Sequence, residues 1–229
     1  MEQLPLPVRL RADALFESFH PGGNGELIAA LRAQGPERIW LWGAAATGKT
    51  HLLQAACANA GLSAAAYFPL GGETRLPPAA LTGLSSRGLV CIDDVHRIAG
   101  DLTWERMLFG LFNEAAEHRT RLIFAASAPP AALPWVLPDW RSRAAACVVY
   151  QLRELDDEGR IAALRLRALQ RGLQLPVETA DYLMRRMPRD LSSLLAVLDD
   201  LDVAALAAQR RLTVPFIRDA LERSARTRP

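Results

Sequence analysis

The segment from residue 38 to residue 57 constrains the fold of this chain more than any other. A buried strand is expected at Arg38–Trp42, then the loop Gly-Ala-Ala-Ala-Thr-Gly-Lys-Thr, then an apolar helical run at residues 51–57. A Gly-x-x-x-x-Gly-Lys-Thr pattern between a strand and a helix is typical of phosphate binding, because loop amides and the helix amino terminus together attract an anion. An ordinary strand-to-helix turn that happens to carry glycine and lysine is the simpler alternative.

The residues of this loop have distinct expected roles. The backbone amides surround the phosphates, Lys49 reaches the β- and γ-phosphates, and the hydroxyl of Thr50 ligates Mg²⁺. We therefore expect the chain to bind ADP or ATP with Mg²⁺. The residues expected to line the nucleotide site are Gly43, Ala46, Thr47, Gly48, Lys49, Thr50 and His51.

Two carboxylates follow a second buried strand. The run Leu89–Ile92 is apolar and leads directly into Asp93 and Asp94. Ligands of open α/β sheets lie beyond the carboxyl ends of the strands, so these acids are expected beside the phosphate loop. Asp93 would join the Mg²⁺ shell and Asp94 would orient or activate the attacking water. Alternatively, either aspartate could cap a helix amino terminus.

Alternation of strands and helices predicts an α/β fold with a parallel, doubly wound sheet. Beyond residue 154 the strands disappear and helices dominate, which predicts a small all-α domain. We expect an extended tail at 1–12, a nucleotide-binding domain at 13–153 and a helical domain at 154–229. Further strands are expected at 64–69, 121–127 and 144–152, with further helices at 13–19, 26–33, 104–119, 156–169, 177–187, 190–209 and 216–223.

Composition narrows the class of protein. Half of the 229 residues are apolar and the net charge is +2, which is typical of a folded domain and shows no dense basic stripe for nucleic acid. The three cysteines lie in apolar runs without metal-ligand spacing, as expected in a reducing cytosol. No signal peptide or membrane-spanning run is evident, so we expect a cytoplasmic protein without a membrane partner.

The combination of these motifs with a helical C-terminal domain resembles AAA+ modules. In detail it is similar to the replication initiator DnaA, through Gly48–Leu53, Ile92–Asp94 and Arg189–Leu191. The chain ends without a counterpart of DnaA's helix-turn-helix domain, and its N-terminal Gln3–Pro7 resembles the motifs that dock on the replicative sliding clamp. An AAA+ module with such a tail resembles the Hda family of DnaA inactivators.

This resemblance implies a role in limiting replication initiation. Arg143 would be the arginine finger that completes a neighbour's nucleotide site, and Arg189 the lid arginine that contacts the chain's own nucleotide. Gln3, Leu4 and Leu6 would bind the sliding clamp, the β subunit of DNA polymerase III. DnaA would be the second partner, and contact with DNA would be made indirectly, through the clamp. The resemblance leaves open whether the chain forms a homodimer. The implied activity is stimulation of the hydrolysis of DnaA-bound ATP.

Three departures from the related sequences bear on activity. Ala46 replaces a central loop glycine, Pro5 replaces a small polar residue of the clamp motif, and Ser127-Ala128 replaces an aspartate-arginine pair. Because of the last change, the sequence leaves open whether the chain hydrolyses ATP itself. An ATP-driven remodeller or helicase loader is the main alternative, which needs robust turnover of its own. A small-molecule phosphotransferase is the second, which needs a substrate pocket.

Overall fold

The computed structural model describes residues 11, 13–35, 37–61, 63–71, 76–188, 190–208 and 212–227, without the side chains of 207, 208 and 222–227. These residues form two compact units, one containing residues 23–154 and one beginning at Leu155. The short segment Glu17–Gly22 belongs to the second unit, and the residues before it belong to the first.

The first unit is built on a parallel sheet. Its strands are β1 (Arg38–Trp42), β2 (Ala65–Pro69), β3 (Leu89–Asp93), β4 (Arg121–Ala126) and β5 (Val148–Gln151), in the order β2-β3-β4-β1-β5. All four pairings are parallel. Every residue of β3 and β4 is buried, as expected for central strands covered on both faces. The predicted α/β fold class is confirmed.

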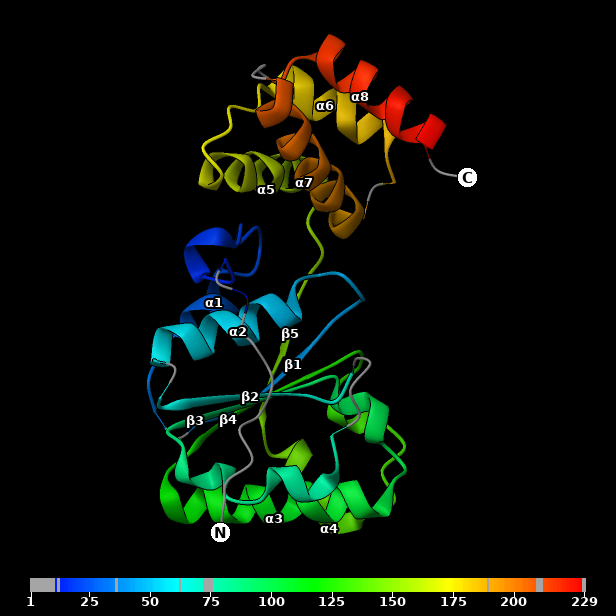
Figure 1. Cartoon of the computed structure of the whole chain (residues 1–229). Helices are drawn as coiled ribbons and strands as arrows, with labels where there is room; N and C mark the ends of the chain where they lie inside the picture. The colour runs from blue at the N-terminus through cyan, green and yellow to red at the C-terminus, as the bar shows by residue number, and fades with distance from the viewer. Residues whose placement is uncertain are drawn as a thin grey trace. The chain divides into compact units, whose positions relative to one another are not determined.

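Helices cover both faces of this sheet (Figure 1). Helices α1 (Gly25–Arg32) and α2 (Lys49–Ala60) lie on one face, and α3 (Leu102–His118) and α4 (Pro138–Ala145) lie on the other. Between α4 and the sheet, Trp140 packs edge-to-face on Phe124 and on Trp135, with ring centroids 5.5 and 5.9 Å apart. Such aromatic contacts hold α4 in a defined position on the sheet. Short 3₁₀ turns lie at Phe16–Ser18, Pro78–Leu81, Leu84–Ser86, Val95–Ile98 and Pro130–Ala132.

Two sequence predictions in this unit are wrong. The sequence predicts no helix at Arg143 and places this residue in a loop just before the last strand, but Arg143 lies in the last turn of α4. Pro138 supplies the first helical residue and Trp140 and Ala144 form the buried face, so a sequence that looks broken by proline is a helix start. Near the N-terminus, the helix expected at 13–19 is only the 3₁₀ turn Phe16–Ser18.

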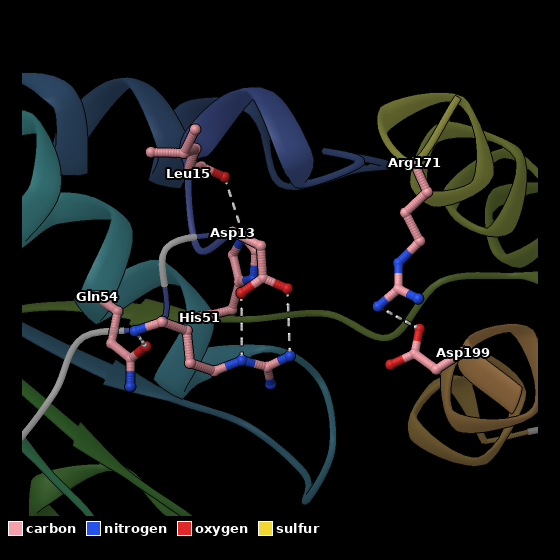
Figure 2. A network of polar contacts seen from close by, with 7 residues as sticks. Asp13, Leu15, His51, Gln54, Arg171 and Asp199 are labelled. Atoms are coloured by element: carbon pink, nitrogen blue, oxygen red, sulfur yellow. Dashed lines mark hydrogen bonds and ion pairs between the residues drawn. The ribbon is translucent and has the colours of Figure 1, made fainter. Parts of the chain in front are cut away.

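The second unit is helical. Its helices are α5 (Asp157–Gln170), α6 (Val177–Arg186), α7 (Leu191–Ala208) and α8 (Val214–Thr227). Asp156 caps α5 by accepting a hydrogen bond from the amide of Gly159. Arg171 forms an ion pair with Asp199 of α7 at 2.8 Å (Figure 2). It forms a second one with Asp202 of the same helix at 3.1 Å. Within the described ranges, no helix of the chain has the length and apolarity needed to cross a membrane.

Candidate nucleotide-binding site

The loop between β1 and α2 has the backbone conformation that its sequence predicts. A side chain at Gly43 would place Cβ 2.6 Å from the carbonyl oxygen of Leu152, so only glycine fits where β1 and the end of β5 converge. Gly48 enters α2 with φ of 101°, a conformation open to glycine. Ala46 also has a positive φ, 60°, which costs a non-glycine residue roughly 1–2 kcal/mol. The replacement of glycine by alanine therefore strains this loop.

Lys49 is held by its own loop. Its ammonium donates hydrogen bonds to the carbonyl oxygens of Gly43 at 2.8 Å and Ala44 at 2.6 Å. The side chain is buried, which lowers the pKa of Lys49, while nearby Asp93 and Asp94 act to raise it. The ammonium thus lies between the loop carbonyls and the two carboxylates, and it can bind a phosphate by exchanging a carbonyl partner.

The carboxylate of Asp93 accepts three hydrogen bonds at the end of β3. The hydroxyls of Thr50 and Tyr67 both donate to Oδ2, at 2.6 and 2.8 Å, and the amide of Asp94 donates to Oδ1 at 2.9 Å. Burial raises the pKa of Asp93, and the hydrogen bonds from Thr50 and Tyr67 partly offset that rise. Because the Thr50 proton points to Asp93, the hydroxyl lone pairs stay available to a cation. This hard-oxygen pair fits Mg²⁺.

Asp94 lies beside the first aspartate in a left-handed backbone conformation, with φ of 59°. Its carboxylate forms an ion pair with Arg97 at 3.6 Å and packs on Gly71, where an added Cβ would lie 2.2 Å from Oδ2. Its side chain makes no capping hydrogen bond to the 3₁₀ turn that follows. The capping alternative for Asp94 therefore has no support in the geometry.

Two histidines lie near the loop. The Nε2 atom of His51 is 2.9 Å from the carbonyl oxygen of Leu15, so its ring is directed to the N-terminal segment (Figure 2). His96 accepts at Nδ1 from the amide of Ser127 at 3.3 Å, just past the end of β4. Burial lowers the pKa of His96, which favours the neutral ring. The backbone amide of Ser127, one of the residues that depart from the related sequences, is thus paired with His96.

Arg143 lies at the other end of the sheet. Its exposed guanidinium lies 5.9 Å from the ring centroid of Phe112, and Arg38 lies 4.6 Å from the same centroid. Arg38 is the first residue of β1, whereas the phosphate loop follows the last, Trp42. Since a strand rises about 3.3 Å per residue, roughly 13 Å of β1 separates the two ends. The geometry thus places Arg143 far from the chain's own phosphate loop.

Residues 157–221 match the family described as Hda, lid domain. This segment is therefore similar to the Hda lid domain. It begins at the first residue of α5 and ends within α8. Over these residues, the match confirms the resemblance to the Hda family.

Similar solved structures define the fold of the whole chain. Domain III of the Thermotoga maritima initiator DnaA has a TM-score of 0.77 and 20% identity, over 94% of this chain and 98% of that domain. DnaA bound to AMPPCP and single-stranded DNA has a TM-score of 0.67 and 22% identity, over 84% of this chain and 65% of that one. The RuvB branch migration motor of T. maritima has a TM-score of 0.61 and 14% identity, over 81% of this chain and 61% of that one. The chain therefore has the AAA+ fold, and its residues 157–221 are similar to the Hda lid domain.

The AAA+ unit brings most of the predicted site residues together. Lys49, Thr50, Asp93 and Asp94 meet at the carboxyl end of the sheet, beside the loop that contains Gly43, Ala46, Thr47 and Gly48. Thr47 bonds within the loop, through its hydroxyl to the carbonyl oxygen of Ala44 at 2.9 Å. The other predicted site residues, Gln3, Leu4, Leu6 and Arg189, lie outside the described residues.

Sequence reasoning missed three residues of this unit. Tyr67 and His96 bind groups at the phosphate-loop end of the sheet, and Glu105 holds the segment before α4. Of the three, only Glu105 could have been found from the sequence pattern. It lies three residues before Leu108 and seven before Phe112, on the buried face of α3. A carboxylate on such a face requires partners.

Glu105 binds the segment that leads into α4. Its fully buried carboxylate accepts from the amides of Gly100, Val136 and Leu137, the last at 2.7 Å. Val136 and Leu137 immediately precede α4, whose last turn carries Arg143. The Glu105 carboxylate therefore helps to set where the arginine is presented.

We expect Glu105→Gln to lower the free energy of unfolding by about 2–4 kcal/mol, because an amide nitrogen would face backbone donors and leave them unpaired. Urea denaturation measures this change. Glu117→Gln, on the exposed side of the same helix, is the matched control and should alter stability by less than about 0.5 kcal/mol. Equal stability of the two variants would mean that the Glu105 contacts do not hold this segment.

Proposed function

We propose that this chain is a negative regulator of replication initiation that acts on DnaA. In this proposal it binds ADP or ATP with Mg²⁺ in its phosphate loop. It docks through Gln3, Leu4 and Leu6 on the DNA-loaded β clamp and supplies Arg143 to the nucleotide of DnaA. DNA is reached through the clamp, and the chain's own hydrolysis is slow or absent.

The position of Arg143 carries this proposal. Its guanidinium is exposed and lies at the amino ends of the strands, whereas the chain's own phosphate loop lies at their carboxyl ends. An arginine in this place is available to a second molecule. Leaving the rings of Phe109 and Phe112 costs only about 0.5–1 kcal/mol at an exposed site. That is small beside the roughly 10³- to 10⁵-fold effect of an arginine finger.

The nucleotide part of the proposal rests on the loop. A similar DnaA structure holds AMPPCP, and the present loop has the glycine conformations, the lysine and the threonine–aspartate pair that a Mg²⁺-nucleotide needs. Bound Mg²⁺ would neutralise phosphate charge, with Thr50 and Asp93 as the residues that hold it. Asp94, beside them, is the residue proposed to orient water.

The proposal is tested by the rate at which DnaA hydrolyses bound ATP when this chain is added with DNA-loaded clamp. Stimulation should depend on the clamp. Exchanging Gln3 and Leu4 for alanine should remove both clamp binding and stimulation while leaving the unfolding midpoint unchanged, since terminal residues contribute little to a core. A pull-down on immobilised clamp measures the binding. If the double variant binds the clamp as well as the parent does, the docking segment lies elsewhere.

A further inference from the structure

A series of polar contacts runs from the N-terminal segment to the carboxylate proposed to hold Mg²⁺. The backbone amide of Arg11 donates to Oε1 of Gln54 at 3.1 Å (Figure 2). Gln54 lies in α2, and its side chain is close enough to the Tyr67 hydroxyl to lower the pKa of that group. The hydroxyl of Tyr67 donates to Oδ2 of Asp93 at 2.8 Å. Thr50 donates to the same oxygen at 2.6 Å.

The direction of each bond is fixed by its partners. Gln54 accepts from Arg11 through its oxygen, so the amide nitrogen of Gln54 is the group available to the Tyr67 hydroxyl. An ionised carboxylate can only accept, so Tyr67 is the donor in its bond to Asp93. The side chains of Gln54, Tyr67 and Asp93 are 6%, 9% and 2% exposed, so water does not compete freely for these bonds.

Tyr67 is placed by the sheet and not by the loop. It pairs in register with Cys91, two residues before Asp93, so the tyrosine and the aspartate lie on the same face of neighbouring strands. Thr50 approaches Asp93 from α2, on the other side of the same oxygen. Without Tyr67, the carboxylate would keep one hydroxyl donor and could turn away from the position that Thr50 and a cation share.

We propose that Tyr67, itself held by Gln54, is a positioning residue for the metal site, and that the Arg11–Gln54 bond couples the N-terminal segment to the Asp93 carboxylate. The inference rests on the nucleotide and Mg²⁺ binding proposed above. It assigns a role to residues outside the phosphate loop and the paired carboxylates. By reciprocity, occupation of the metal site and retention of the segment at Arg11 favour one another.

The first test is the Mg²⁺ concentration at which the full chain binds a fluorescent ADP, with EDTA as the metal-free baseline. Tyr67→Phe should need roughly 10-fold more Mg²⁺, the lower end of what loss of a partner of a metal ligand costs. Binding in EDTA should be unchanged. Tyr150→Phe, the same change on β5, is the control and should match the parent. An unchanged Mg²⁺ requirement in Tyr67→Phe would overturn the inference, whereas a parent that binds no nucleotide would overturn the proposed function.

The second test needs neither metal nor nucleotide. Amide hydrogen exchange at Arg11 reports its bond to Gln54, and Gln54→Leu should accelerate it roughly 10-fold or more while the core of β3 and β4 stays protected. Tyr67→Phe should accelerate exchange at Arg11 by less than Gln54→Leu does. The oxygen of Gln54 is still present as the acceptor, but the Gln54 side chain has lost its contact with the Tyr67 hydroxyl. If Arg11 exchanges at the parent rate in both variants, the coupling of this segment to Asp93 is refuted.

Discussion

An Arg143→Ala variant should stimulate ATP hydrolysis by DnaA no more than buffer does, while binding ADP and the clamp as the parent does. The guanidinium lies on the last turn of α4, away from the chain's own loop, so its removal leaves that loop intact. The transition state concentrates charge on the transferred phosphoryl group, which a planar, permanently charged donor stabilises. The loss should be the finger's whole contribution, up to roughly 10³- to 10⁵-fold in rate.

Two further variants sharpen this result. Arg141→Ala removes a cation from the same helix, two residues away, and should keep most of the stimulation. Arg143→Lys keeps the positive charge but loses the planar set of donors of the guanidinium group. This variant should therefore restore little of the stimulation of ATP hydrolysis by DnaA. Single-turnover hydrolysis of radiolabelled ATP on DnaA measures all three. Stimulation by Arg143→Ala equal to that of the parent would refute the trans-acting mechanism.

Lys49→Ala should lose its bound nucleotide, with ADP affinity reduced by about 100-fold or more. The buried ammonium, held by two loop carbonyls, can exchange one of them for a phosphate oxygen. Hydrogen bonds to charged groups contribute about 1.5–3 kcal/mol each. Lys49→Met, which keeps the apolar stem, should bind as poorly as Lys49→Ala. Calorimetric titration with ADP and Mg²⁺ measures the affinity.

The sequence offers an independent check, because Lys49 is the only lysine among the 229 residues. An acyl-phosphate analogue of ATP, which acylates lysine in nucleotide sites, should modify the peptide that contains Lys49, and excess ADP should block the reaction. Modification that ADP does not reduce would contradict the proposed site.

Rapid, sustained ATP turnover by the isolated chain would instead favour the remodeller alternative.

The parts of the fold that local pattern controls were predictable. The apolar runs of β1, β3 and β4 are continuous because these strands are buried on both faces, and the glycine-bounded loop marks the β1–α2 junction. The lid helices carry their own start signals, such as Asp156 before α5 and Asp190 before α7. Two hydrogen bonds from Ser192 and Ser193 lower the pKa of Asp190 to about 2.

What escaped prediction depends on contacts between distant segments. Helix α4 has few apolar residues and begins at a proline. It is stabilised by Trp140 in the aromatic core and by Glu105 on another helix. Tyr67 reaches Asp93 only because β2 and β3 are adjacent and in one register. The residues around Tyr67 predict neither that β2 lies next to β3 nor the register in which the two strands pair. The placement of Arg143 on a helix follows from the same long-range packing.

The most direct test of the account is the fate of ATP bound to DnaA when this chain, preloaded with ADP, is added on DNA-loaded clamp. Because the chain then holds no ATP, any phosphate released within one turnover comes from DnaA. The account predicts that the parent accelerates this release, that omitting the clamp weakens the effect, and that Arg143→Ala abolishes it. Release at the same rate with the parent, with Arg143→Ala and without either would contradict the claim that this chain completes the nucleotide site of DnaA.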